Sequence, residues 1–185
     1  MANLQSSIST ASRSAAIIIP STSLTISYPT LQNLISNFQK NLAAIGITPH
    51  SPVSIALPNN LEFIVSFLAT AAQRGIAAPL NPAYKQGEFE FFIDDVKSKL
   101  VVVPRGAVSA GAPAVKAARK FGVAIAEVWW DDRGGEICLE VLEKGGLRGG
   151  AKVERAEPED VALVLHTSGT TGRPKAVGLL LGRRE

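Results

Sequence analysis

The stretch Leu165-His-Thr-Ser-Gly-Thr-Thr-Gly-Arg-Pro-Lys-Ala-Val177 is the most informative part of this sequence. An apolar run typical of a β-strand, Asp160 to His166, leads into it. Six of the nine residues from Thr167 to Lys175 are glycine, serine or threonine, and the ninth is a lysine. Glycines allow the backbone to approach a ligand closely, and successive N–H groups in such a turn can surround an anion. The composition therefore predicts a phosphate-binding loop.

Backbone, hydroxyl and ammonium groups of this loop are the candidate ligands for a polyphosphate. Gly169 and Gly172 lack a Cβ, the serine and threonines supply hydroxyl donors, and Lys175 supplies a mobile positive charge. The candidate binding residues are Thr167, Ser168, Gly169, Thr170, Thr171, Gly172 and Lys175. The alternative is a bare turn between two strands with a solvated lysine. The order of residues over the whole stretch favours the binding loop.

The stretch differs from the common P-loop, which is G-x-x-x-x-G-K-[ST] at the start of a helix. Here Gly169 and Gly172 are three residues apart, Pro174 precedes the lysine, and Ala176 replaces the hydroxyl that would bind magnesium. The apolar run from Ala176 to Leu181 predicts a second strand rather than a helix. We therefore expect a mobile loop between two strands, with the phosphate away from any helix N-terminus.

Residues Thr167 to Val177 match T-S-G-[ST]-T-G-x-P-K-[GA]-V throughout. This pattern resembles the phosphate-loop signature of the adenylate-forming enzymes, which include acyl-CoA synthetases, luciferases and the adenylation domains of peptide synthetases. Two further segments resemble acyl-CoA synthetases: P-N-N-L-E-F at Pro58–Phe63 and G-I-A-A-P-L-N-P at Gly75–Pro82. The resemblance covers about Ile17 to Val177. It is strongest to fungal peroxisomal-type and plant oxalyl-CoA synthetases, judged from the segments Ala77–Tyr84 and Leu165-His166.

The resemblance implies a two-step reaction. A carboxylic acid attacks the α-phosphorus of ATP to give an acyl-adenylate and pyrophosphate, and a thiol, usually coenzyme A, then accepts the acyl group. ATP and Mg²⁺ are the implied cofactors, and coenzyme A is the co-substrate of the full-length family. The loop would hold the β- and γ-phosphates. His166, at a family position beside the loop, is a further candidate, although a packed histidine at a strand end is the favoured interpretation.

The family's other motifs, for ribose, for magnesium and for the catalytic lysine, are not recognisable in this sequence. The match also ends at Val177, before Gly178–Glu185. We therefore expect residues 15–185 to be an N-terminal fragment of an AMP-binding domain that is inactive alone, with a truncated sheet whose apolar edge favours aggregation or self-association. The alternatives are a non-catalytic nucleotide- or anion-binding module and a non-functional gene fragment.

Composition excludes several other classes. Of 185 residues, 46% are hydrophobic and 19% charged, as in ordinary globular proteins. The net charge is +3 and the basic residues are scattered, so we predict no nucleic-acid partner. The single cysteine, Cys138, excludes an internal disulfide and is interpreted as a passive strand residue rather than a reactive thiol. The two histidines lie far from it in sequence, so no zinc-ligand spacing is present.

The longest apolar runs fall short of the roughly 18 residues of a membrane span, so we predict no transmembrane segment. Cysteine usage and the resemblance favour a cytoplasmic or peroxisomal location, without a C-terminal peroxisomal signal in this chain. Residues 1–14 are rich in serine and are predicted to be a disordered N-terminus, with a weak organelle transit peptide as the alternative.

Strand and helix patterns alternate along the middle of the chain, which predicts parallel βαβ crossovers in a partial three-layer α/β/α domain with a mostly parallel sheet. The expected strands are Val53–Leu57, Ile76–Leu80, Leu100–Val103 and Val123–Trp129, and the expected helices are Thr30–Ile45, Leu61–Arg74, Gln86–Ser98 and Ala112–Phe121. Before them we expect a hairpin of Ala15–Ile19 and Leu24–Tyr28. Thr30 is the expected N-cap and Gly46 the expected C-cap of the first helix. Asp131–Glu159 is predicted to be a solvent-exposed connection with one short strand, Ile137–Leu142.

Overall fold

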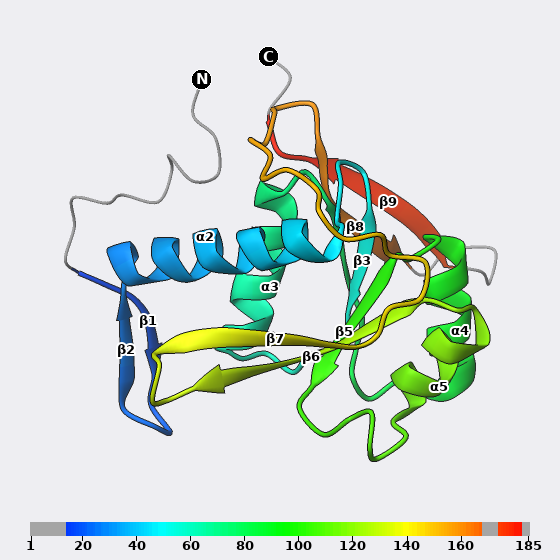
Figure 1. Cartoon of the computed structure of the whole chain (residues 1–185), viewed down its shortest axis with the longest axis horizontal. Coiled ribbons are helices and arrows are strands. Elements are labelled where there is room, and N and C mark those ends of the chain that lie inside the picture. Colours follow the sequence, from blue (N-terminus) through cyan, green and yellow to red (C-terminus); the bar gives the residue numbers. More distant parts are fainter. Residues whose placement is uncertain (1–13, 168–173, 183–185) are drawn as a thin grey trace.

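The structure is a computed structural model that describes residues 14–167 and 174–182. Within these ranges it contains a two-stranded sheet, a seven-stranded sheet and four helices (Figure 1). The expected disordered N-terminus lies outside the described residues, apart from Ser14. Among the described residues, none of the helices combines the length and the apolarity needed to cross a membrane.

The large sheet has the strand order β7-β6-β5-β3-β4-β8-β9. Its five central strands run parallel, while the end strands β7 and β9 are antiparallel to their neighbours. The strands are β3 (Pro52–Ile55), β4 (Ile76–Pro79), β5 (Leu100–Pro104), β6 (Ala124–Asp131), β7 (Glu136–Glu143), β8 (Val161–Thr167) and β9 (Lys175–Leu180). The predicted α/β class with a mostly parallel sheet is confirmed.

The helices lie on both faces of this sheet (Figure 1). They are α2 (Tyr28–Ile45), α3 (Leu61–Ala72), α4 (Gln86–Asp95) and α5 (Pro113–Lys120). Successive residues of a strand point to opposite faces, so Leu100 and Val102 pack in the cluster that contains α2 and α3. Val101 and Val103 pack in the cluster that contains α4 and α5. The two clusters confirm the three-layer α/β/α arrangement.

The first helix begins earlier than its sequence suggests. Its N-cap is Ser27, whose Oγ accepts a hydrogen bond from the Thr30 N–H at 3.3 Å, so the prediction of Thr30 as the N-cap was wrong. Pro29 does not delay the helix, because a proline in the first turn lacks only an N–H that would have no intrahelical partner there. The predicted C-cap is confirmed: Gly46 has φ 102°, and a Cβ there would lie 2.5 Å from the Arg148 carbonyl oxygen.

The two predicted hairpin strands, β1 (Ala15–Ile19) and β2 (Leu24–Ser27), form the small antiparallel sheet, which packs against α2. The strand expected at Ile137–Leu142 is present as β7. It belongs to the main sheet, because it pairs with β6, and Ile137 and the partly buried Leu139 pack in the core cluster of α2 and α3. The rest of the connection lies mostly at the surface, as predicted. It is nevertheless held to the body, where Gln73 donates hydrogen bonds to the carbonyl oxygens of Ile47 and Lys152.

Candidate functional site

The two ends of the predicted phosphate loop are held by an antiparallel pair of strands. Thr167, the last residue of β8, lies opposite Lys175, the first residue of β9, and the Thr167 hydroxyl lies 3.5 Å from the Lys175 carbonyl oxygen. The prediction that the stretch connects two strands is therefore confirmed. The other predicted binding residues, Ser168, Gly169, Thr170, Thr171 and Gly172, lie outside the described residues. Lys175 is exposed.

The two ends of the loop, Thr167 and Lys175, lie at the carboxyl edge of the parallel sheet. Strand β8 runs parallel to β4, with Leu163 opposite Ala77, so Thr167 follows the sheet at the same edge as the loops after β3 and β4. Ligands of open α/β sheets bind outside the carboxyl ends of the strands, because loops and unpaired backbone groups converge there. The position of these two loop ends therefore suits a binding role, which composition alone could not have shown.

His166 is packed at the end of β8, as the favoured interpretation predicted. Its side chain is 6% exposed, and its ring centroid lies 4.6 Å from that of Phe92 and 6.3 Å from that of Phe91. It also has a polar partner on another element, because its Nε2 lies 2.9 Å from the Asp95 Oδ2 at the end of α4. Asp95 was not among the predicted site residues.

One signal could have pointed to Asp95. The last turn of α4 carries two carboxylates, Asp94 and Asp95, where the helix dipole disfavours negative charge. Each has a partner that offsets this cost: Lys97 lies 2.6 Å from Asp94, and His166 lies beside Asp95. The first pairing is local in sequence, whereas the second spans 71 residues and depends on tertiary packing.

Aromatic residues of α4 and of the loop after β4 support this end of the site. The rings of Tyr84 and Phe92 stack with centroids 5.1 Å apart, and Tyr84 contacts Phe89 edge-on at 5.9 Å. Because Phe92 also contacts His166, the Asn81–Tyr84 turn, α4 and the end of β8 form one packed group. The apolar face predicted for α4 therefore packs against the end of β8, from which the predicted phosphate loop begins.

The opposite end of β8 is anchored by an ion pair. The guanidinium of Arg74 donates hydrogen bonds of 3.0–3.1 Å to Asp160, which directly precedes β8 and is 2% exposed. The bond to Asp160 raises the pKa of Arg74 above its ordinary value. Glu157 accepts two further hydrogen bonds from the same guanidinium at 2.9 Å. The start of β8 is thus fixed to the C-terminal end of α3.

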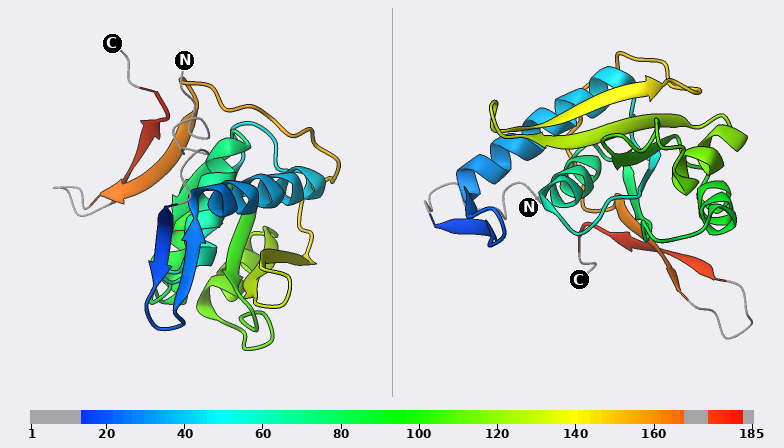
Figure 2. Two further views of the ribbon diagram at one scale, coloured as in Figure 1. Left: turned by 90° about the vertical axis from the view of Figure 1, so that its left-hand side faces the viewer. Right: turned by 90° about the horizontal axis from the view of Figure 1, so that it is seen from below.

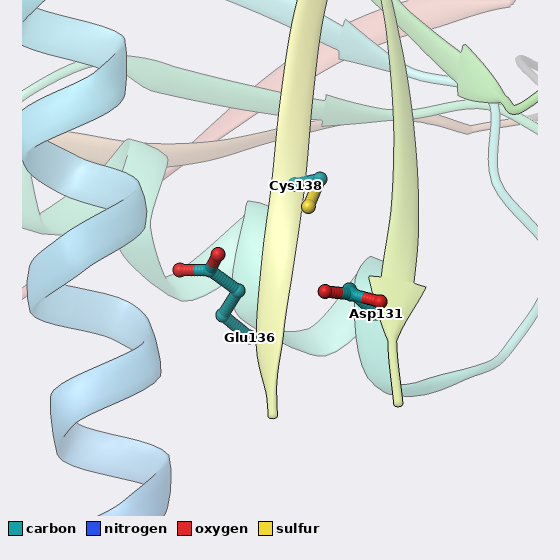
Figure 3. A group of neighbouring side chains, drawn as sticks. All are labelled: Asp131, Glu136 and Cys138. Atoms are coloured by element: carbon teal, nitrogen blue, oxygen red, sulfur yellow. The ribbon is translucent and has the colours of Figure 1, made fainter. Parts of the chain in front are cut away.

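The described residues at the carboxyl edge do not make a magnesium site. Asp95 is already hydrogen-bonded to His166, and the side chain of Ala176 has no oxygen to offer. Among the described residues, three side chains at the tip of the β6–β7 hairpin lie close enough to hold a metal ion together: Asp131, Glu136 and Cys138 (Figure 3).

The hairpin tip is better described as a turn than as a metal centre. The Asp131 carboxylate accepts hydrogen bonds from the backbone N–H groups of Arg133 and Gly134, which shape the turn. Burial, and then the charges of Glu136 and Asp131, raise the pKa of the Cys138 thiol, so the thiolate that binds metals is disfavoured. This agrees with the interpretation of Cys138 as a passive strand residue.

Comparison with known proteins identifies the protein family to which the chain belongs. The family model described as AMP-binding enzyme matches residues 5–180. The chain therefore belongs to the AMP-binding enzyme family, as its phosphate-loop motif indicated.

Within this family, the chain is similar to oxalate–CoA ligases. The chain is 34% identical over 197 residues to oxalate–CoA ligase from Saccharomyces cerevisiae, and 37% identical over 155 residues to oxalate–CoA ligase from Arabidopsis thaliana. These alignments cover 91% and 83% of this chain, but only 36% and 30% of the relatives. The chain thus spans about a third of the length of the curated relatives that it matches.

Solved structures agree with this assignment. ATP-bound MatB from Rhodopseudomonas palustris superposes with a TM-score of 0.72 and 26% identity, over 96% of this chain and 34% of that one. An N-terminal domain of FACL13 from Mycobacterium tuberculosis superposes with a TM-score of 0.68 over 98% of this chain and 44% of that one. At 21% identity the second similarity concerns the fold alone. The fold is that of the N-terminal part of adenylate-forming enzymes.

Proposed function

We propose that Thr167 to Lys175 binds the β- and γ-phosphates of ATP, as the phosphate loop of an adenylate-forming acyl-CoA ligase. The observation that carries this proposal is the pairing of Thr167 with Lys175 at the carboxyl edge of a parallel sheet. Thr167 and Lys175 thus lie where α/β sheets bind ligands, which supports a ligand-binding role for the segment that joins them. Membership of the AMP-binding enzyme family supports the same assignment.

Each predicted residue has a distinct part in this clamp. Gly169 and Gly172 let the backbone N–H groups approach the phosphates, and the hydroxyls of the serine and threonines donate further hydrogen bonds. Lys175 adds a positive charge that offsets the charge of the polyphosphate. Pyrophosphate is the leaving group of the reaction, so such a clamp would position and stabilise it rather than act on the carboxylate.

We propose that the complete reaction is the conversion of a carboxylic acid to its acyl-adenylate and then to its coenzyme A thioester. Two of the relatives act on oxalate by their names, which makes a small dicarboxylate a substrate class to test alongside medium-chain fatty acids. The 185 residues would supply only the phosphate clamp. Without a positioned carboxylate, roughly 7–11 kcal/mol of barrier lowering is missing, so the chain by itself should not release pyrophosphate.

ATP binding by the 185-residue chain tests the clamp directly. We expect Lys175→Ala to weaken ATP binding in isothermal titration calorimetry with magnesium present, and Gly169→Val to abolish it, because a side chain would fill the space of the phosphates. Lys40→Ala removes an exposed lysine from α2 and should bind ATP like the parent chain. The assignment is wrong if Lys175→Ala and Gly169→Val also bind like the parent.

A pyrophosphate-release assay tests the second part of the proposal. Oxalate and medium-chain fatty acids would be supplied with ATP, with and without coenzyme A. We expect no turnover above background from the purified chain. Turnover would show that the catalytic groups lie within these 185 residues.

We also propose that the protein is cytoplasmic or peroxisomal.

We further propose that the open edge of β9 mediates self-association. All six residues of β9 are exposed, and the strand is paired with β8 on one side. An apolar edge strand with free N–H and C=O groups is a template for another strand.

A further inference from the structure

We propose that His166 and Asp95 form a positioning pair that holds the loop-side end of β8, so that the hydrogen bond between them raises the affinity of the loop for ATP. The inference rests on the proposed function, because it assigns a part in ATP binding to two residues outside the loop. His166 directly precedes Thr167, and Thr167 is paired with Lys175 across the hairpin. The position of the His166 backbone therefore sets where both ends of the loop begin.

The geometry of the pair suits a positioning role. The His166 ring is largely buried beside Phe92, so its orientation is restricted, and its Nε2 points to the Asp95 Oδ2 at 2.9 Å. An ionised carboxylate can only accept, so Nε2 carries the proton in this hydrogen bond. A charge-assisted bond to a buried ring is stronger than one between two solvated groups. The pair thus joins the end of α4 to the end of β8.

Strand β8 needs attachment at this end. It pairs with β4 through a register in which Leu163 lies opposite Ala77, and β9 on its other side is exposed throughout. The Arg74–Asp160 ion pair fixes the start of β8, six residues before His166. His166 and Asp95 supply a side-chain anchor at the other end, where the loop begins. The two anchors together hold both ends of the strand to the body.

Loss of the second anchor should act on ATP binding more than on folding. Without it, the end of β8 samples more positions, and ATP binding must then restrict them at an entropic cost. Losing one hydrogen bond of this kind should weaken ATP binding about three- to tenfold. The fold should persist, because removing Asp95 also removes a negative charge that the dipole of α4 disfavours.

Three variants separate the hydrogen bond from packing. Asp95→Ala removes the acceptor, whereas Asp95→Asn retains an oxygen that can accept from Nε2. His166→Phe keeps an aromatic ring against Phe92 but removes the donor. We expect Asp95→Ala and His166→Phe to weaken ATP binding, with melting temperatures close to that of the parent, and Asp95→Asn, which keeps an acceptor but loses the charge, to weaken it less than Asp95→Ala.

A second measurement does not depend on ATP. The ring nitrogens of His166 in ¹⁵N-labelled chain should show a proton on Nε2 that is held in the hydrogen bond, and this signature should be lost in Asp95→Ala. If the parent fails to bind ATP, the proposed function fails, while the ring signature still reports whether the pair exists in solution. Parent-like ATP affinity in Asp95→Ala and His166→Phe overturns the positioning role. Equal weakening by Asp95→Asn and Asp95→Ala overturns the hydrogen bond as its cause.

Discussion

The inner strands of the sheet and the β8–β9 hairpin differ in how deeply their residues are buried. Four of the five residues of β5 are buried between the two helical layers, whereas all six residues of β9 are exposed. Figure 2 shows β9 on the outer side of β8, away from the helices. Buried apolar area provides most of the stability of a fold, so the free energy of unfolding resides in the body. The predicted phosphate loop belongs to the β8–β9 hairpin, which contributes least to this free energy, as is common for ligand-binding loops on a rigid scaffold.

Two leucines provide the sharpest test of this difference. Leu42 on α2 is fully buried, and Leu179 on β9 is 47% exposed. Leu42→Ala leaves a cavity among close-packed side chains and should lower the free energy of unfolding by about 2–5 kcal/mol. Leu179→Ala should change it by less than about 0.5 kcal/mol. Urea unfolding followed by circular dichroism measures both values on the same scale.

The proposed difference between the body and the hairpin would be wrong if both substitutions lowered the free energy of unfolding equally. A large loss from Leu179→Ala would mean that β9 is covered in solution. A strong dependence of that loss on protein concentration would identify a second copy of the chain as the cover, because dimers lose stability on dilution.

The exposed edge of β9 gives the second prediction. The strand reads K-A-V-G-L-L, without a proline, and its one charge lies at its first residue. Charged residues on an edge strand oppose pairing with another chain. Leu179→Lys should therefore shift sedimentation-velocity profiles toward the monomer at concentrations where the parent associates. Val153→Lys, at a similarly exposed apolar site off the sheet edge, is the control and should sediment like the parent.

Association could also proceed elsewhere on the surface. If Val153→Lys and Leu179→Lys dispersed the protein equally, net charge rather than the β9 edge would control association. If neither variant changed a parent that associates, the edge would not be the contact. A parent that stays monomeric at all concentrations would remove the self-association proposal altogether.

Local patterns predicted the body well because its determinants are local. Alternation of strand and helix runs located four of the parallel strands, and Gly46 was identified from its place after an apolar helical pattern. Ser27 was missed as the N-cap because Pro29 interrupts the pattern that would mark the start of the helix. The inclusion of β7 in the main sheet was missed as well. Its pairing with β6 is local, across a short turn, but the glycines and charged residues of 131–159 indicated an exposed connection instead.

The candidate site was predicted only in part, for the same physical reason. The loop motif and its two flanking strands are contiguous in sequence, so the sequence contained them. Asp95 lies 71 residues from His166, and the contact exists only because α4 packs beside the end of β8. The anchoring of β8 by Arg74 and Asp160, 86 residues apart, has the same origin. Long-range polar contacts of this kind leave no periodic trace in the sequence.

The smallest expected effect concerns the surface of the body, where α4 meets α5. A hydrogen bond from Lys120, and then one from Gln86, lowers the pKa of Glu90 below its ordinary value. A carboxyl group whose pKa is lower in the folded state stabilises the fold above its unfolded pKa, and this contribution is lost as pH falls through the folded pKa. The Lys120 partner is exposed and the pair lies at the protein surface, so the stabilisation itself should be slight.

The pKa of Glu90 can nevertheless be followed by a carboxyl ¹³C titration. Lys120→Ala should raise that pKa toward its ordinary value but not fully, because the Gln86 amide remains 2.8 Å from the carboxylate. Lys116→Ala, one turn earlier on α5, is the control and should leave the Glu90 titration unchanged. An ordinary pKa for Glu90 in the parent would mean that the Lys120 contact does not persist in solution. The packing of α4 against α5 would then depend on the buried residues of these helices alone. The body would be stabilised by its core, whereas the β8–β9 hairpin is attached at its ends by polar side chains.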